Sequence, residues 1–266
     1  MSGALRGERV LLTRSEEDSR RLAAAIGERG GVASIAPLTR IAPPADPGPL
    51  QRERARLGSY DWIAVTSRHG VAAALRGVSP PEERRPRVAA VGRSTARESL
   101  AAGWPADLVA PRGDGVSLAE ELERRFDLDG AAVLHPTSNL SPGGLAERLR
   151  RAGATVRELE AYRTLPPEDG GARLRELVGE ARPAAVVFAS PSAVHRFVEL
   201  LGDGGAIPSG MIAVAIGSTT AGAARRAQAR RIETAETRDD DGLLAALERA
   251  LSRSRPREER GERETR

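Results

Sequence analysis

Two short sequence patterns each occur twice in this chain, in the order A, B, A, B, and this repetition limits the possible folds more than any other feature. Pattern B has two segments: residues 65–71 (VTSRHGV) with 91–96 (VGRSTA), and residues 188–194 (FASPSAV) with 216–221 (IGSTTA). The segments lie 25 positions apart in the first copy (Ser67 to Gly92) and 27 apart in the second (Ser190 to Gly217). Such self-similarity indicates repeated structural units.

Pattern A is shorter. Residues 10–13 (VLLT) match residues 133–136 (VLHP), and a glycine follows 20 positions after the start of each copy, at Gly30 and Gly153. Each glycine is placed to end a helix, and an extended stretch follows it. Two copies of one fold explain the alternating order, and chance similarity among alanine-rich segments is the alternative.

Six short apolar runs predict the strands. Each run is followed by small polar residues and then by a helical pattern, at residues 9–14, 62–67, 88–92, 132–134, 185–189 and 212–217. Nearly continuous apolar runs indicate strands buried on both faces, and alternation with helices of about 10–15 residues indicates parallel βα units. We expect an α/β fold of two similar domains, each a parallel β-sheet flanked by helices.

The repeat order leaves the connectivity open. The domains are either sequential, or the chain crosses out after the first copy of pattern A and returns after the second. Residues 38–44 (LTRIAPP) and 162–167 (YRTLPP) suit two crossing linkers, because both are extended and end in Pro-Pro, which blocks helix. The charged tail from Ser252 onward lacks apolar residues and is expected to be disordered.

Composition excludes several classes of function. The chain has no cysteine, which rules out disulfides, thiolate metal sites and cysteine nucleophiles. Arginine supplies all of the 41 Lys and Arg residues, but acids are interspersed with them and aromatics make up only 3%, so nucleic-acid binding is not expected. No apolar run is long enough for a signal peptide or a membrane span, so we expect a cytoplasmic protein without a membrane partner. We also expect a monomer. P-loop, G-x-S-x-G, G-x-G-x-x-G and H-E-x-x-H motifs are absent, and neither metal nor cofactor is expected.

The carboxyl ends of the expected strands are rich in hydroxyls and glycine, at residues 13–15, 66–68, 92–95, 135–138, 190–192 and 217–220. Ligands of parallel sheets bind at this edge, and the free N–H groups of a helix N-terminus attract anions. Six such ends on two domains that face each other would form a cleft for a ligand with several negative groups. The alternative for each loop is ordinary N-capping by Ser or Thr.

Four further side chains invite a functional interpretation. His69 and His195 lie just inside expected helices, where a surface role is expected, and His135 at a strand end is the better catalytic candidate. Tyr162 lies on the proposed return linker. Its phenol could donate a proton to a leaving group or hold a ligand, and the alternative is a tyrosine packed in a hinge.

The chain resembles the uroporphyrinogen-III synthase family over residues 10–251. The matching segments are residues 10–14, 60–67 with Val71, 90–96, Gly153 with Val156 and 162–164, 188–194 and 215–221. The resemblance implies two α/β domains joined by a two-stranded extended linker. Domain 1 would comprise residues 1–37 plus 167–251, domain 2 residues 42–161, the linker residues 38–41 and 162–166, and the tail residues 252–266.

The resemblance also implies a reaction. A cofactor-free lyase of tetrapyrrole (haem, sirohaem and corrinoid) biosynthesis would cyclise hydroxymethylbilane, which carries eight carboxylates, to uroporphyrinogen III with loss of water and inversion of the last pyrrole ring. Tyr162 would be the proton donor or leaving-group anchor. The residues expected to bind substrate are Arg14, Ser67, Arg93, Thr95, Ser190, Ser192, Ser218, Thr219 and Thr220. Residues 135–139 (HPTSN) depart from the Gly/Arg loop of many relatives, so no arginine role is carried onto them.

Two other functions remain open. A two-lobed module that binds an anionic ligand, or regulates through one, has a similar layout. A secretion signal or an attached DNA-binding domain would favour it, and neither is seen. A catalytically inactive relative kept as a regulator is the third option, and only an assay separates it from an enzyme.

Overall fold

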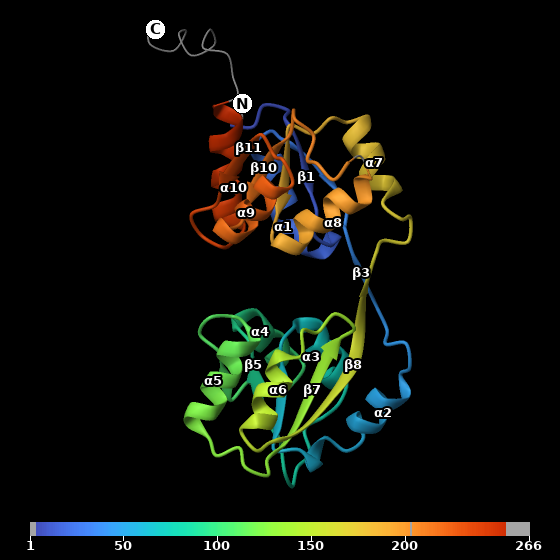
Figure 1. The fold of residues 1–266 in the computed structure, drawn as a ribbon, viewed down its shortest axis with the longest axis vertical. Coiled ribbons are helices and arrows are strands. Elements are labelled where there is room, and N and C mark those ends of the chain that lie inside the picture. Colours follow the sequence, from blue (N-terminus) through green and yellow to red (C-terminus); the bar gives the residue numbers. More distant parts are fainter. Residues whose placement is uncertain (1–3, 203, 254–266) are drawn as a thin grey trace, which may run out of the picture. The chain divides into compact units, whose positions relative to one another are not determined.

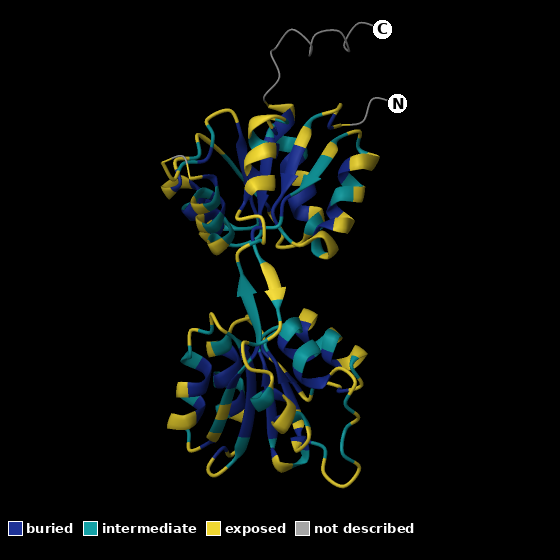
Figure 2. Ribbon diagram, turned by 90° about the vertical axis from the view of Figure 1, so that its right-hand side faces the viewer, coloured by how far each residue is buried: buried dark blue, intermediate teal, exposed yellow. Residues whose placement is uncertain are grey.

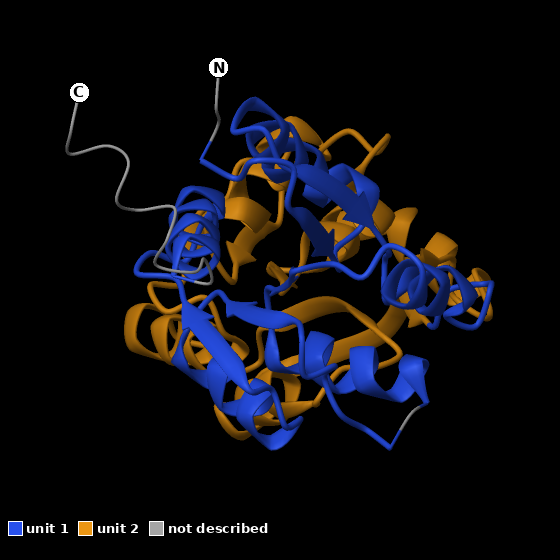
Figure 3. Cartoon of the chain, turned by 90° about the horizontal axis from the view of Figure 1, so that it is seen from above, with its two compact units in different colours: residues 1–40, 166–266 blue, residues 41–165 orange. Residues whose placement is uncertain are grey.

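A computed structural model describes residues 4–202 and 204–253 of the 266-residue chain. It divides into two compact units: unit 1 is Met1–Arg40 with Pro166–Arg266, and unit 2 is Ile41–Leu165 (Figures 1 and 3). Both divisions fall inside the linkers expected at residues 38–41 and 162–166. Unit 1 therefore contains the first copy of pattern A and the second copy of pattern B. Unit 2 contains the first copy of pattern B and the second copy of pattern A.

Unit 1 contains a five-stranded sheet in the order β11-β10-β9-β1-β2, and all of its pairings are parallel. The strands are β1 (Arg9–Leu12), β2 (Val32–Ile35), β9 (Ala185–Phe188), β10 (Ile212–Ala215) and β11 (Arg231–Thr234). Successive side chains of a strand point to opposite faces. Val10 and Leu12 accordingly join one core cluster, while Leu11 joins the other.

Helices cover both faces of the unit 1 sheet. Leu22 of α1 (Glu16–Glu28) and Leu247 of α10 (Asp240–Ser252) pack in the first cluster. Leu177, Phe197 and Ala223 pack in the second and belong to α7 (Ala172–Gly179), α8 (Pro191–Leu201) and α9 (Ser218–Arg226). Because α10 includes Ser252, the helix runs into the segment expected to be the tail, whose residues 254–266 lie outside the described residues.

Unit 2 contains a six-stranded sheet in the order β3-β8-β7-β4-β5-β6. The strands are β3 (Arg40–Ala42), β4 (Trp62–Val65), β5 (Arg87–Ala90), β6 (Leu108–Val109), β7 (Ala132–Ser138) and β8 (Thr155–Leu165). The pairings among β4 to β8 are parallel. β3 adjoins β8 on the first crossing segment, and the two arrows run in opposite directions in Figure 2.

The helices of unit 2 also form two layers. Leu50 of α2 (Gly48–Arg54) and Val71 of α3 (Arg68–Leu75) share a core cluster with Ile63 and Val65, and Ala96 of α4 (Arg93–Ala101) packs against it. The other face is covered by α5 (Gly115–Arg125) and α6 (Gly144–Arg151), together with Trp62 and Ala64. A short 3-10 turn, η1 (Leu57–Ser59), precedes β4. The strands form the buried centre of each unit (Figure 2).

A buried carboxylate fastens α2 and the turn after it to β8. Glu53 is 3% exposed and accepts hydrogen bonds from Arg56 Nε (2.6 Å), Tyr60 Oη (2.7 Å) and Arg157 Nε (3.2 Å). These bonds, that from Arg56 above all, lower the pKa of Glu53 to about 2. Burial, and after it the neighbouring Glu53, raises the pKa of Tyr60 to about 12.

The Glu53 cluster makes the stability of unit 2 depend on acidity. The pKa of Glu53 in the folded chain lies below the ordinary value of 4.5. Its contribution to the free energy of unfolding is therefore complete above about pH 4.5 and is lost as the pH falls toward 2. We expect Glu53→Gln to lower the free energy of unfolding at pH 7 by on the order of 3 kcal/mol and to flatten its decline between pH 5 and 3. Thermal unfolding across that range measures both effects, with the exposed Glu82→Gln as control. Parallel wild-type and Glu53→Gln profiles would contradict the assignment.

Candidate functional site

Each sheet has one topological switch point. In unit 1, β1 leads to β2 on one side, while the neighbouring β9 leads to β10 and β11 on the other. In unit 2 the same divergence separates β4 from β7. Ligands of open parallel sheets bind at the edge where such strands end, which we call the carboxyl edge. The candidate side chains lie at or near these edges, in loops, first helical turns or, for Tyr162, near the end of β8.

Two of the expected substrate-binding serines are helix N-caps. Ser67 Oγ accepts from the N–H of Gly70 at 2.9 Å, and Ser190 Oγ accepts from the N–H of Ala193 at 3.2 Å. Ser190 also shares a 3.0 Å hydrogen bond with the exposed Ser192. Capping uses an acceptor lone pair of the hydroxyl and leaves its O–H as a donor. The capping role therefore accounts for these residues without preventing them from donating to a carboxylate.

Glycine takes the N-cap position of α4 and α9. Gly92 and Gly217 provide no capping side chain, so no cap acceptor occupies the first N–H groups of these helices. Arg93, Ser218 and Thr219 are exposed at the first two helical positions. Thr95 (5% exposed) and Thr220 (3%), at the third position, turn inward. The side chains open to a ligand are thus those of the first two positions, and the binding role of Thr95 and Thr220 stays a prediction.

The guanidinium of Arg14 already has a carboxylate partner. Its Nη2 lies 2.6 Å from Oδ1 of Asp240 in the first turn of α10, and both side chains are largely buried. Thr13 beside it donates a 2.7 Å hydrogen bond to the Val187 carbonyl, which fixes the start of this loop on β9. A substrate carboxylate would have to share Arg14 with Asp240.

An arginine that the sequence analysis missed lies against the N-cap of α9. A methyl group on Gly217 would lie 3.2 Å from Nε of Arg238, in the loop between β11 and α10. Arg238 has no hydrogen bond or ion pair with the residues that the structure describes. Thr237 and Gly242 pack so closely that a side chain at Gly242 would meet the Thr237 backbone, which fixes the loop carrying Arg238. A cation is unfavourable at a helix N-terminus. An anion bound beside Arg238 would therefore offset the repulsion between its guanidinium and the N-terminus of α9.

Unit 2 has a related loop before α5. A methyl group on Gly92 would lie 3.7 Å from Gly113 Cα, but the adjacent Arg112 is paired with Glu120. Arg112 follows Gly92 by 20 positions and Arg238 follows Gly217 by 21. Extending the comparison of the repeats past residues 96 and 221 would have found both arginines.

A pocket of about 1230 Å³ lies at the carboxyl end of β5 and along α4. Its lining includes Gly92, Arg93, Arg97 and Arg112. Arg93 and Arg97 have no acidic partner among the described residues, and like charges four positions apart on a helix repel each other. This surface is therefore suited to negative groups.

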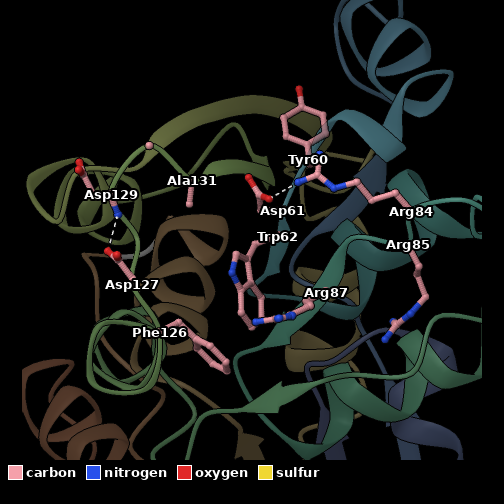
Figure 4. A pocket seen from close by; sticks show the side chains of 11 residues that line it. Tyr60, Asp61, Trp62, Arg84, Arg85, Arg87, Phe126, Asp127, Asp129 and Ala131 are labelled. Atoms are coloured by element: carbon pink, nitrogen blue, oxygen red, sulfur yellow. Dashed lines mark hydrogen bonds and ion pairs between the residues drawn. The ribbon is translucent and has the colours of Figure 1, made fainter.

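A second pocket, of about 510 Å³, lies at the opposite edge of the unit 2 sheet (Figure 4). Its arginines are already engaged. Arg84 pairs with Asp61, Arg85 pairs with Asp107 at 2.6 Å, and Arg87 lies over the rings of Trp62 and Phe126, 5.4 and 5.3 Å from their centroids. We assign no function to this pocket.

Tyr162 has a neighbour that the sequence analysis did not anticipate. The imidazole of His69, the second residue of α3, packs against the Tyr162 ring with the centroids 5.5 Å apart and the planes tilted by 52°. Both residues are partly buried. The simple surface role expected for His69 is therefore wrong. His195 is exposed on α8, as expected.

His135 lies inside the sheet. It is 2% exposed, and its Nδ1 donates a 2.8 Å hydrogen bond to the Ala64 carbonyl. Burial lowers its pKa, so the ring is neutral at pH 7. The placement of His135 at a strand end is wrong, because strand β7 continues past it to Ser138.

Within residues 4–202 and 204–253, no three His, Asp or Glu side chains are grouped to hold a metal ion. Over the same residues, no helix is both long and apolar enough to cross a lipid bilayer.

Comparisons with known proteins agree with one another. The family model described as uroporphyrinogen-III synthase HemD matches residues 20–245. A uroporphyrinogen-III synthase from Synechococcus elongatus is 27% identical over 254 residues, covering 91% of this chain and 95% of that protein. Crystal structures of uroporphyrinogen III synthases from Thermus thermophilus (TM-score 0.65, 22% identity, 93% of this chain and 100% of that one) and Helicobacter pylori (0.57, 16%, 92% and 99%) share the fold.

Proposed function

Because the chain belongs to the uroporphyrinogen-III synthase family, we propose that it cyclises hydroxymethylbilane to uroporphyrinogen III, with loss of water and inversion of the last pyrrole ring. The observation that carries this proposal is the concentration of anion-binding groups at the carboxyl edges of both sheets. Glycine-capped helices begin there in each unit, and Arg93, Arg97 and Arg238 have no acidic partner among the described residues.

The substrate explains why such groups are useful. A linear tetrapyrrole with carboxylates along its length needs donors at several separate points, and helix N–H groups, serine hydroxyls and guanidinium groups all donate to carboxylates. In this proposal Ser67, Arg93, Ser190, Ser192, Ser218 and Thr219 bind carboxylates directly. Arg238 joins them as a ligand beside the N-terminus of α9.

Ring closure begins when the terminal hydroxyl leaves. In our proposal the Tyr162 hydroxyl donates a proton to that oxygen, the C–O bond breaks with its electron pair on oxygen, and water departs. The azafulvene cation left behind is attacked by the α-carbon of the last pyrrole ring that already carries a bridge. The bond from this α-carbon to its old bridging carbon then breaks, and the freed bridging carbon is attacked by the unsubstituted α-carbon of the same ring. That carbon loses its proton to the Tyr162 phenolate, so the ring ends inverted and the tyrosine is restored. The Tyr162 hydroxyl is free for this task, because none of the described residues hydrogen-bonds to it.

The reaction is tested by supplying the purified protein with freshly generated hydroxymethylbilane and separating the ring isomers after oxidation. We expect the type III isomer. Recovery of the spontaneous type I ring alone would defeat the proposal. Tight binding of the tetrapyrrole without turnover would favour the two-lobed binding module or an inactive regulator instead.

Removal of the Tyr162 hydroxyl tests its role. We expect Tyr162→Phe to lower kcat by about 100-fold or more, the range of a lost general acid, with product affinity little changed. Tyr60→Phe is the matched control, since it removes the other phenol of the chain, which is bonded to Glu53, and should lower the melting temperature but not kcat. An unchanged kcat in Tyr162→Phe would remove Tyr162 from the chemistry.

Arg238 is tested by its effect on substrate binding. A hydrogen bond to a charged group contributes about 1.5–3 kcal/mol, so Arg238→Gln should raise KM roughly 10-fold or more and change kcat little. Arg230→Gln is the control, because Arg230 is exposed in the same unit just before β11, at the opposite edge of the sheet. Equal KM values for the two variants would exclude Arg238 as a ligand.

A further inference from the structure

We propose that His69 is a positioning residue for Tyr162: its ring fixes the orientation of the phenol so that the hydroxyl points at the leaving group. This inference rests on the role proposed for Tyr162. It concerns the contact between two rings 93 positions apart in the sequence, whose centroids lie 5.5 Å apart.

Strand pairing fixes the backbone of Tyr162, but the orientation of its ring depends on side-chain packing. Tyr162 pairs with Ser138 at the end of the β7–β8 ladder, just after a register shift between Thr137 and Ser138. Rotation about the Cα–Cβ bond swings the phenol oxygen, whereas rotation about the Cβ–Cγ bond, which has broad minima, turns the ring plane in which the phenolic O–H lies. Both rotations are therefore limited by what packs against the ring, which is the hydrophobic core of unit 2 together with the imidazole of His69.

A close approach of α3 to β7 brings His69 to this place. A methyl group on Gly70 would lie 3.0 Å from the Pro136 carbonyl oxygen and 3.3 Å from Ser67 Oγ. Gly70 thus lets the first turn of α3 rest on the end of β7. Its own N–H donates to Ser67, which caps the helix and fixes the direction in which His69 leaves it.

The unusual sequence His135-Pro136 provides the surface on which that turn rests. In unit 1 the carbonyl of Leu12, paired with Ile35, accepts from the N–H of Ala36, one position beyond its partner. By the same rule Ala64 would accept from residue 136, but proline has no N–H. The pairing of β4 with β7 ends at Leu134, and His135 Nδ1 donates to the Ala64 carbonyl instead.

These contacts connect His135, Pro136, Gly70 and His69 into one structural unit. His135 satisfies the carbonyl that Pro136 leaves open, Gly70 packs on Pro136, and His69 reaches the Tyr162 ring from the same helical turn. A misplacement of about 1 Å at a reacting group can cost about 100-fold in rate. The contact of the rings, not the charge of the imidazole, is what this role requires.

The test compares His69→Ala with His69→Phe, which keeps a ring. We expect His69→Ala to lower kcat about 10- to 100-fold with KM changed less than about two-fold, and His69→Phe to recover most of kcat. Because His69 acts through Tyr162, adding His69→Ala to Tyr162→Phe should cause little further loss, which is the non-additivity of coupled sites.

Each other result overturns the inference. An unchanged kcat in His69→Ala would do so, as would a His69→Phe variant no faster than His69→Ala, or losses that multiply in the double variant. Melting temperatures of all variants show whether the chain remains folded, and Gly70→Ala gives a second route, since moving α3 away from Pro136 should reproduce the effect of His69→Ala. A wild-type protein that forms no type III isomer would instead defeat the proposed function.

Discussion

A parallel sheet forces every helix that follows a strand to begin at the same edge. In both units this geometry gathers helix N-termini, with their free N–H groups and positive dipole ends, beside one another. The opposite edge gathers helix C-termini, and the arginines of its pocket are already paired or stacked. The attraction of the carboxyl edges for anions therefore follows from strand direction, before any particular side chain is considered. Side chains such as Arg93 and Arg238 strengthen this attraction.

The N-cap residues differ between helices in a way that separates stability from ligand binding. Helices α5 and α10 begin with Asp114 and Asp239, whose carboxylates accept N–H bonds of 2.7 and 2.8 Å. Helices α4 and α9 begin with glycine and forgo such a bond. Aspartate at those two positions would occupy the N–H groups and repel a carboxylate ligand. The chain thus caps α5 and α10 with acids and leaves the first N–H groups of α4 and α9 open to a polyanion.

Much of this arrangement could be predicted from the sequence, because it depends on local patterns. The apolar runs predicted β1, β4, β5, β7, β9 and β10 but not the edge strands β6 and β11. The repeats predicted two similar α/β units, and the strand ends identified the loops rich in hydroxyls. The inward turn of Thr95 was also available, since Ser99 lies one helical turn further on the same buried face. Contacts between distant segments could not be predicted in this way. His69 meets Tyr162 only because Pro136 interrupts a ladder and Gly70 permits a close approach, and the function of His135 depends on a carbonyl 71 positions away. Arg238 was missed for a simpler reason, since the comparison of the repeats ended too early.

The exchange of pattern copies between the two units has a consequence for synthesis on the ribosome. Unit 2 is one continuous segment, Ile41–Leu165, and all of it has been made before the second part of unit 1 emerges. The first 40 residues carry β1 and β2, but β1 borders β9, which is translated more than 140 residues later. Domains generally fold as units during translation. The newborn chain must therefore carry an unfinished amino-terminal sheet, with β1 unpaired on one side, while the middle of the protein folds, and the segment made first is among the last to reach its native structure.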